Sequence, residues 1–341
     1  MDTKIFDIEK LNLKEKEKAI YEASQAIKSG ELVIFPTETV YGIGADGLNY
    51  EAVSNIYKAK GRPSDNPLIL HVCDLDMVRD VTDCDLGVLE KLAKAFWPGP
   101  FTAVLKKSEK VPLITTGGLD TVAVRIPDND IAVELIRKSG TPIAAPSANI
   151  SGKPSPTKPE HVIHDMSGKV KIILCGDKCR VGIESTIIDL TNEEPMILRP
   201  GIISATQISK VIGRTVAMDA AASIKNRESE NDVNPKAPGM KYKHYAPSAQ
   251  MIILQGKRSD VEREITEIKK QRESQGEKVG VILFEENDFE NAARELFSKL
   301  RKMDDDGVDL ILAGALDEKD EIGFAVMNRM LKSAGYNVRE V

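Results

Sequence analysis

Short apolar runs alternate with amphipathic stretches from residue 13 to about residue 212, and this alternation restricts the possible folds more than any other feature of the sequence. Apolar side chains recur at helical spacing in residues 14–28, 50–60 and 86–96. Because the expected helices are fewer than the expected strands, several connections must be hairpins or long loops. The pattern predicts a mixed, twisted α/β sheet with helices, not a strictly doubly wound one. The expected strands are 32–35, 68–72, 101–105, 121–126, 142–145, 171–175, 185–190 and 196–199.

The chain changes character after residue 212. Residues 213–250 are polar, contain three prolines and have few large apolar side chains, which is typical of a linker. Strand–helix units then follow one another regularly, which predicts a small Rossmann-like parallel sheet. We therefore expect a large domain at 1–212, a linker at 213–250 and a small α/β domain at 251–341. The expected strands of the small domain are 251–255, 279–284 and 308–313, and its helices are 260–274, 289–302 and 321–334.

Charge and composition narrow the function classes. The 47 Lys and Arg residues are outnumbered by 53 Asp and Glu residues, and this balance argues against a broad, sequence-independent grip on nucleic acid. No apolar run reaches the ~18 residues of a membrane span, and the first ten residues are charged, so we expect a cytoplasmic protein without membrane contact. Four cysteines without a C-x-x-C pair are too few for a disulfide framework and are expected to be free thiols.

A polar, glycine-containing segment follows the expected strand that ends at Phe35. Residues 36–47 read P-T-E-T-V-Y-G-I-G-A-D-G, and their end matches G-x-G-x-x-G by letter. In a dinucleotide site the first glycine follows the strand almost directly, whereas six residues intervene here, so we favour a glycine-containing turn. The hydroxyls of Thr37 and Thr39 are placed to bind a small polar ligand.

Basic and hydroxyl-bearing residues accumulate at three further strand or helix ends. Lys60 and Arg62 close the helix at 50–60, where they either complement the helix dipole or clamp a phosphate or carboxylate. Arg125 lies on an apolar strand, where an inward-facing guanidinium must find an anion and an outward-facing one need not. The run A-P-S-A-N at 145–149 is either a tight loop or a place where backbone approaches a ligand.

A second chemistry for the same region is zinc binding. His161, His164, Cys175 and Cys179 form an H-x-x-H…C-x-x-x-C set of tetrahedral type. The spacing does not match a common zinc module, and both halves have ordinary explanations in a helix start and a strand end. We therefore favour a structural role for these residues and expect no resident metal.

Together, K-G-R at 60–62, S-A-N at 147–149 and P-T-E-T-V-Y-G at 36–42 resemble the YrdC-like family of threonylcarbamoyl-AMP synthases. The resemblance covers residues 14–212, and P-G-M-K-Y-K-H-Y-A-P at 238–247 with the small α/β domain is similar to the family's two-domain form. It implies a nucleotidyltransferase that condenses L-threonine, bicarbonate or CO2 and ATP into threonylcarbamoyl-adenylate and pyrophosphate. The product would pass to a transferase that modifies tRNA, and Mg²⁺ would be carried by the ATP phosphates.

The resemblance also implies roles for individual residues. Lys60, Arg62, Ser147 and Asn149 would be catalytic. Threonine would be surrounded by Thr39, His71, Arg125, Ala145 and Ser185. ATP would be held by Lys60, Arg62, Asn66, Thr121, Ser147, Ser155 and Arg199.

The end of the linker is unusually rich in aromatic and basic side chains for an inert spacer. Residues 241–245, K-Y-K-H-Y, can stack on apolar groups and pair with phosphate or carboxylate. We therefore expect Tyr242, His244 and Tyr245 to form a lid that shields a labile adenylate from water.

Two other functions compete with this interpretation. One is a non-catalytic protein that makes weak contacts with structured RNA through Lys58, Lys60, Arg62, Lys241 and Lys243. The other is a nicotinamide enzyme built on the glycine-containing segment, against which the displaced first glycine already counts.

Overall fold

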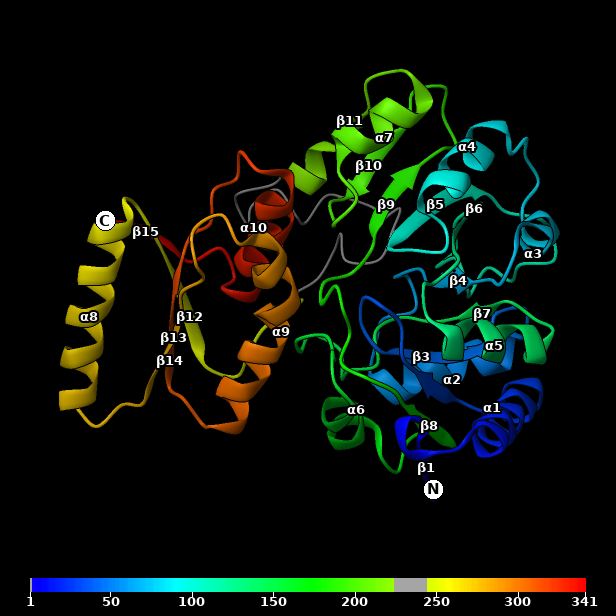
Figure 1. Ribbon diagram of the computed structural model, residues 1–341, viewed down its shortest axis with the longest axis horizontal. Coiled ribbons are helices and arrows are strands. Elements are labelled where there is room, and N and C mark those ends of the chain that lie inside the picture. Colours follow the sequence, from blue (N-terminus) through cyan, green and yellow to red (C-terminus); the bar gives the residue numbers. More distant parts are fainter. Residues whose placement is uncertain (1, 224–243) are drawn as a thin grey trace.

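The computed structural model describes residues 2–223 and 244–341, which form two sheets in two lobes (Figure 1). The larger sheet has the strand order β1-β8-β2-β3-β7-β4-β6-β5-β9-β10-β11 and contains both parallel and antiparallel pairs. Its strands are β1 (Lys4–Asp7), β2 (Val33–Phe35), β3 (Gly42–Asp46), β4 (Ile69–His71), β5 (Phe101–Lys106), β6 (Thr121–Arg125), β7 (Ile143–Ala144), β8 (Ile172–Cys175), β9 (Thr186–Asp189), β10 (Met196–Arg199) and β11 (Ala217–Met218).

Amphipathic helices cover this sheet with their apolar faces, and several of them begin at a residue whose side chain caps the first turn. In α1 (Leu13–Lys28) the cap is Asn12, which forms a capping box with Glu15. Two short 3-10 helices, η1 (Ile8–Lys10) and η2 (Ala220–Ser223), flank the sheet's first and last strands. The remaining helices are α2 (Tyr50–Lys60), α3 (Leu75–Val81), α4 (Gly87–Phe96), α5 (Asp130–Ser139), α6 (Pro159–Met166) and α7 (Ala205–Ile212).

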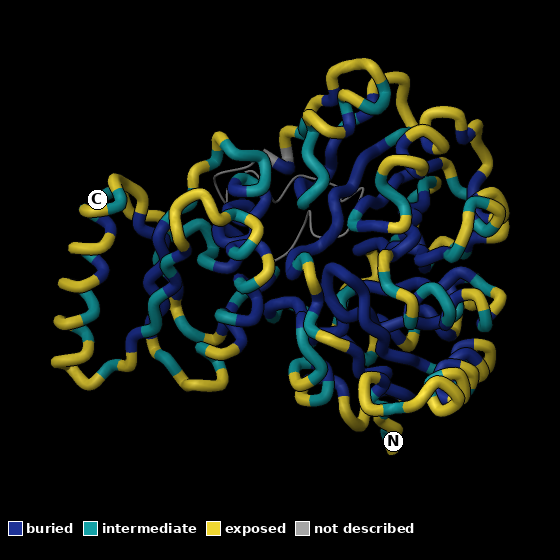
Figure 2. Tube along the Cα trace, in the orientation of Figure 1, coloured by how far each residue is buried: buried dark blue, intermediate teal, exposed yellow. Residues whose placement is uncertain are grey.

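The smaller sheet is entirely parallel and has the order β13-β14-β12-β15. One of its faces is covered by α8, and the other carries α9 and α10, which lie between this sheet and the larger lobe (Figure 1). Buried residues lie on both sides of the boundary where the two lobes meet (Figure 2). The elements are β12 (Gln250–Gln255), α8 (Arg258–Ser274), β13 (Val279–Ile282), α9 (Phe289–Asp305), β14 (Leu310–Gly314), α10 (Glu321–Ser333) and β15 (Val338–Glu340).

The mixed α/β sheet and the small parallel sheet predicted from the sequence are confirmed. The glycine-containing turn is wrong, because Gly42–Asp46 is strand β3, paired antiparallel with β2. The glycines serve packing there: a Cβ on Gly44 would lie 2.5 Å from the Ile143 side chain and 2.7 Å from the Phe35 ring. Residues 217–218, within the segment expected to be a linker, add strand β11 to the larger sheet.

Candidate active site

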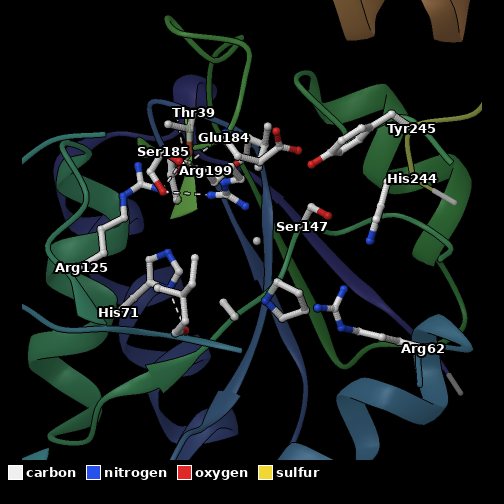
Figure 3. Close-up of a pocket in the computed structure, with 16 residues that line it drawn as sticks. Thr39, Arg62, His71, Arg125, Ser147, Glu184, Ser185, Arg199, His244 and Tyr245 are labelled. Atoms are coloured by element: carbon white, nitrogen blue, oxygen red, sulfur yellow. Dashed lines mark hydrogen bonds between the residues drawn. The ribbon is translucent and has the colours of Figure 1, made fainter. Parts of the chain in front are cut away.

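A polar pocket lies where several strands of the larger sheet end and where residues 244–245 approach them (Figure 3). Three arginines and several hydroxyls face it, and Glu184 is the one carboxylate among the described residues that line it. No helix in the described ranges is long and apolar enough to cross a membrane. The lining residues are Thr37, Thr39, Val40, Gly42, Arg62, Ile69, His71, Arg125, Ala145, Pro146, Ser147, Glu184, Ser185, Arg199, His244 and Tyr245.

The loop between β2 and β3 fixes the hydroxyl of Thr39. Thr37 Oγ1 accepts hydrogen bonds from the backbone N–H groups of Thr39 and Val40, so the loop is tied to one of its own side chains. Thr39 Oγ1 lies 2.9 Å from Thr37 Oγ1 and accepts a hydrogen bond from Arg125 Nη1 at 3.0 Å. The Thr39 side chain is therefore buried, with its hydroxyl held against a fixed cation.

Arg125 ends β6 and faces inward, which decides the question that alternation left open. Its guanidinium forms an ion pair with Glu38 (Nη2–Oε1 2.7 Å), and both side chains are almost fully buried. The carboxylate oxygens of Glu38 have no hydrogen-bond partner among the described residues, so Arg125 is the charge that compensates them. Sequence reasoning missed Glu38, although its place between Thr37 and Thr39 put it beside the expected ligand site.

His71 lies next to Arg125, because β4 pairs with β6 in parallel register. Burial, followed by the charge of Arg125, lowers the pKa of His71 to about 3, so the imidazole is neutral at physiological pH. Its edge contacts the Phe35 ring at a centroid distance of 5.9 Å. A neutral ring beside a guanidinium can accept or donate a hydrogen bond to a polar ligand without adding charge.

Ser185 and Arg199 line the pocket beside Thr39 and Arg125 (Figure 3). Arg199 donates from Nη2 to Ser185 Oγ and from Nε to the Ser185 carbonyl, both at 3.1 Å, and Thr102 Oγ1 lies 2.7 Å from the same hydroxyl. Burial lowers the pKa of Arg199 to about 10, so the guanidinium still carries its charge at neutral pH. A second fixed cation–hydroxyl pair thus lies beside the pair formed by Arg125 and Thr39 (Figure 3).

Arg62 and Ser147 line another side of the pocket (Figure 3). The left-handed Gly61 (φ 62°) ends α2 and turns Arg62 away from the helix into the pocket rim (Figure 3). Lys60 does not line the pocket; its ammonium donates to the carbonyls of Ser147 and Asn149 and holds that loop. Burial, and then the charge of Arg62, lower the pKa of Lys60 well below its ordinary value.

The predicted site residues separate into those that line the pocket and those that lie behind it. Ser155 donates to Glu184, Asn149 accepts from Ser147 Oγ, and Thr121 is at the far end of β6, about 13 Å from Arg125 at ~3.3 Å per residue. Asn66 is buried, and its Oδ1 has no hydrogen-bond partner within the described part of the chain. The predicted residues in the pocket are Thr39, Arg62, His71, Arg125, Ala145, Ser147, Ser185, Arg199, His244 and Tyr245.

Tyr245 is the part of the expected lid that the structure places most firmly. Its ring packs on Phe297 of α9 at a centroid distance of 5.0 Å, and its hydroxyl points towards Glu184 (Figure 3). Burial, followed by the charge of Glu184, raises the pKa of Tyr245 to about 12. His244 lines the pocket beside Arg62, whereas Tyr242 lies outside the described residues.

The competing chemistries are less well served by the geometry. Residues 2–223 and 244–341 contain no group of three or more His, Cys, Asp or Glu side chains that could hold a metal, so the zinc set is not assembled. Glu184, the pocket's one carboxylate among the described residues, already accepts hydrogen bonds from Ser155 and Arg329. Lys60 is buried and cannot reach an RNA backbone, and Lys241 and Lys243 lie outside the described residues.

These features define a class: an α/β protein with a small polar pocket whose fixed guanidinium–hydroxyl pairs suit an anionic ligand, and whose wall includes residues 244–245 from beyond the larger domain. Comparison with known proteins narrows the class. The family model Sua5_yciO_yrdC, described as "Telomere recombination", matches residues 25–201, and the model of the threonylcarbamoyl-AMP synthase C-terminal domain matches residues 203–335. The chain therefore belongs to the Sua5/YciO/YrdC family and has its two-domain form.

Individual relatives extend this similarity over nearly the whole chain. A threonylcarbamoyl-AMP synthase of Pyrococcus abyssi is 49% identical over 94% of this chain and 95% of its own length. The Bacillus subtilis threonylcarbamoyl-AMP synthase is 42% identical, with 94% of each chain covered. The crystal structure of P. abyssi Sua5 complexed with L-threonine superimposes with a TM-score of 0.89 and 46% identity, covering 100% of this chain and 99% of that one.

Proposed function

We propose that this protein is a threonylcarbamoyl-AMP synthase, which condenses L-threonine, bicarbonate or CO2 and ATP into threonylcarbamoyl-adenylate and pyrophosphate. The observation that carries the proposal is the pocket in which Arg62, Arg125 and Arg199 converge with the hydroxyls of Thr39 and Ser185. A chain 49% identical over almost its full length bears this enzyme's name, and that similarity supports the same activity here.

The threonine side of the pocket is formed by the residues around Arg125. A guanidinium that already holds Thr39 and Glu38 is a fixed fork for the threonine carboxylate. The neutral His71 ring, the Ser185 hydroxyl and the backbone of Ala145 would complete the shell around the amine and the side chain. The amine must be unprotonated to attack carbon, and the nearby guanidinium charges favour that form.

The ATP side would be formed by Arg62, Ser147 and Arg199, with the other residues predicted for ATP behind them. The carbamate oxygen attacks the α-phosphorus, the bond from that phosphorus to the bridging oxygen breaks, and pyrophosphate leaves. This chain supplies no covalent step in that sequence; its residues position the reactants and offset phosphate charge. Lys60 and Asn149 would act by holding the Ser147 loop in place, while Mg²⁺ would arrive bound to the substrate nucleotide.

His244 and Tyr245 would cover one side of the pocket. Tyr245 is anchored on Phe297, so the second domain holds the end of this cover in place. A covered pocket would keep water away from the mixed anhydride between carbamate and phosphate. The product would then pass, in the cytoplasm, to a transferase that acts on tRNA, and weak contact with that RNA would use surface outside the pocket.

The proposal is tested by product analysis. The purified protein with Mg²⁺, ATP, threonine and bicarbonate should release pyrophosphate and form an adenylate detectable by mass spectrometry. Omitting threonine should remove most of the pyrophosphate. Release of inorganic phosphate in place of pyrophosphate, at a rate that threonine does not change, would identify an ordinary ATPase and contradict the proposal.

A further inference from the structure

A buried guanidinium of the C-terminal domain reaches the wall of the pocket. Arg329 lies on α10 and is fully buried, and apart from the Ala325 carbonyl of its own helix its hydrogen-bond partners belong to the N-terminal domain. Its Nε donates to Glu184 Oε2 at 3.2 Å, its Nη2 donates to the Glu184 carbonyl at 3.4 Å, and its Nη1 donates to the Pro200 carbonyl. One side chain therefore touches the neighbours of two pocket residues, Ser185 and Arg199.

The charge of Glu184 makes this contact consequential. Glu184 is the pocket's one carboxylate within the described residues, and the pocket otherwise presents three arginines. An unpaired carboxylate beside the phosphates of a nucleotide would repel them, because the low-dielectric site screens the charges poorly. Burial alone would raise the pKa of Glu184, but the charges of Arg329 and Arg199 outweigh burial and hold that pKa below its ordinary value.

Glu184 also has structural work that accounts for its presence. Its Oε1 accepts a hydrogen bond from Ser155 Oγ at 2.6 Å, and the Tyr245 hydroxyl points towards it. Glu184 thus joins the segments that contain Ser155, Tyr245 and Arg329. Its carboxylate, however, places a negative charge in a pocket suited to anions. Arg199 of the same domain supplies part of the compensating charge, but the ion pair itself comes from Arg329 on α10 of the other domain.

We propose that Arg329 is a positioning residue of the synthase site: it neutralises Glu184 and fixes the backbone beside Ser185 and Arg199, so that the pocket accepts ATP only when the C-terminal domain is docked. The inference rests on the proposed function, since it concerns the nucleotide of that reaction. It gives the second domain a part in substrate binding that does not depend on a ligand of its own.

The same interface offers a matched control. Arg301 of α9 is also buried, and it pairs across the interface with Asp165 (Nη2–Oδ2 2.7 Å) and donates to the Pro154 carbonyl. Neither Asp165 nor Pro154 lines the pocket. A role in docking alone predicts the same behaviour for Arg329 and Arg301, whereas a role in the site predicts that they differ.

The experiment compares Arg329→Met, Arg301→Met, and the double variants Arg329→Met with Glu184→Gln and Arg301→Met with Asp165→Asn. Both single variants should lower the melting temperature, because each leaves a buried carboxylate unpaired. Only Arg329→Met should raise the KM for ATP, by about 10- to 100-fold, with a much smaller change for zwitterionic threonine. Adding Glu184→Gln should restore most of the ATP affinity, since the repelling charge is gone.

Three results would overturn the inference. In the first, Arg329→Met and Arg301→Met change the KM for ATP equally; in the second, Arg329→Met keeps the wild-type KM. In the third, Glu184→Gln fails to restore ATP binding in the double variant, which folds without a buried unpaired charge. Failure of the proposed function would be recognised separately, because the wild-type protein would then show no threonine-dependent pyrophosphate release.

Discussion

The two sheets use their buried charges in opposite ways. In the larger sheet, buried Arg125 and Arg199 lie at strand ends and face a shared pocket. In the smaller domain, Arg301 and Arg329 are equally buried but point out of their own fold, into carboxylates of the larger one. The smaller sheet thus has an apolar core of its own on the side of α8, while Arg301 and Arg329 pair with carboxylates of the neighbouring lobe.

This difference shows how a second domain can affect a binding pocket without binding a ligand itself. A buried charge is costly unless an opposite charge compensates it. The direction in which a buried charged side chain points therefore identifies the group that neutralises it. Within the larger lobe the compensation is local, as between Glu38 and Arg125. At the interface the two charges of each pair belong to different domains. The net charge of the pocket therefore depends on whether the C-terminal domain is docked.

Arg125→Met would give the largest effect, because it breaks the local pairing. Glu38 would remain buried without a counterion, which costs about 3–5 kcal/mol of stability, and threonine would lose its carboxylate fork. We expect activity below detection and a marked drop in the free energy of unfolding, measured by urea denaturation. The double variant with Glu38→Gln should regain stability but not activity; a double variant that stays as unstable as Arg125→Met would contradict this account.

Arg62→Ala tests the rim of the pocket, where the half-buried guanidinium donates to the backbone carbonyls of Asn66 and Pro67. We expect a loss of about 2–4 kcal/mol of transition-state stabilisation, tens- to a thousandfold in kcat/KM, with an unchanged melting temperature. Arg62→Lys should also be poor, because a point charge does not replace the planar fork. Full activity in Arg62→Ala would contradict this prediction and would limit the role of Arg62 to complementing the dipole of helix α2.

Elements that depend on local sequence could be predicted, whereas elements that depend on contacts distant in the sequence could not. Strands such as Phe101–Lys106 and helices such as Tyr50–Lys60 carry their own periodicity, so they were predicted within a residue. Strand Gly42–Asp46 was missed, because glycines have low strand propensity and its reason for being a strand is the packing of Phe35 and Ile143.

The site shows the same limit. Arg62 and Ser147 belong to short motifs and Arg125 to an apolar strand, and the structure brings all three to one pocket. Glu184 and Arg329 are separated by 145 residues and belong to no motif, so no local pattern could indicate their pairing. Their assigned roles, like those of the other site residues, stay predictions for the experiments above.

The smallest expected effect concerns two histidines, one in each kind of environment. His71 is in the pocket, and His161 lies on α6, near Arg301 of the interface. Burial, followed by a neighbouring arginine, lowers the pKa of each to about 3. Because both pKa values are depressed, the unfolded chain binds more protons between pH 3 and 6.5, and stability must fall as the pH is lowered through that window.

Replacing His71 by Gln should therefore flatten the fall in stability on acidification. Between pH 6.5 and 5.5 the wild-type protein should lose about 1 kcal/mol more than His71→Gln, measured by urea denaturation at each pH. His161→Gln is the matched control outside the pocket and should flatten the curve by a similar amount, because the pKa of His161 is also lowered to about 3. Equal pH dependence in His71→Gln and the wild-type protein would show that the pocket histidine is not held neutral, and that Arg125 leaves room for an imidazolium beside it.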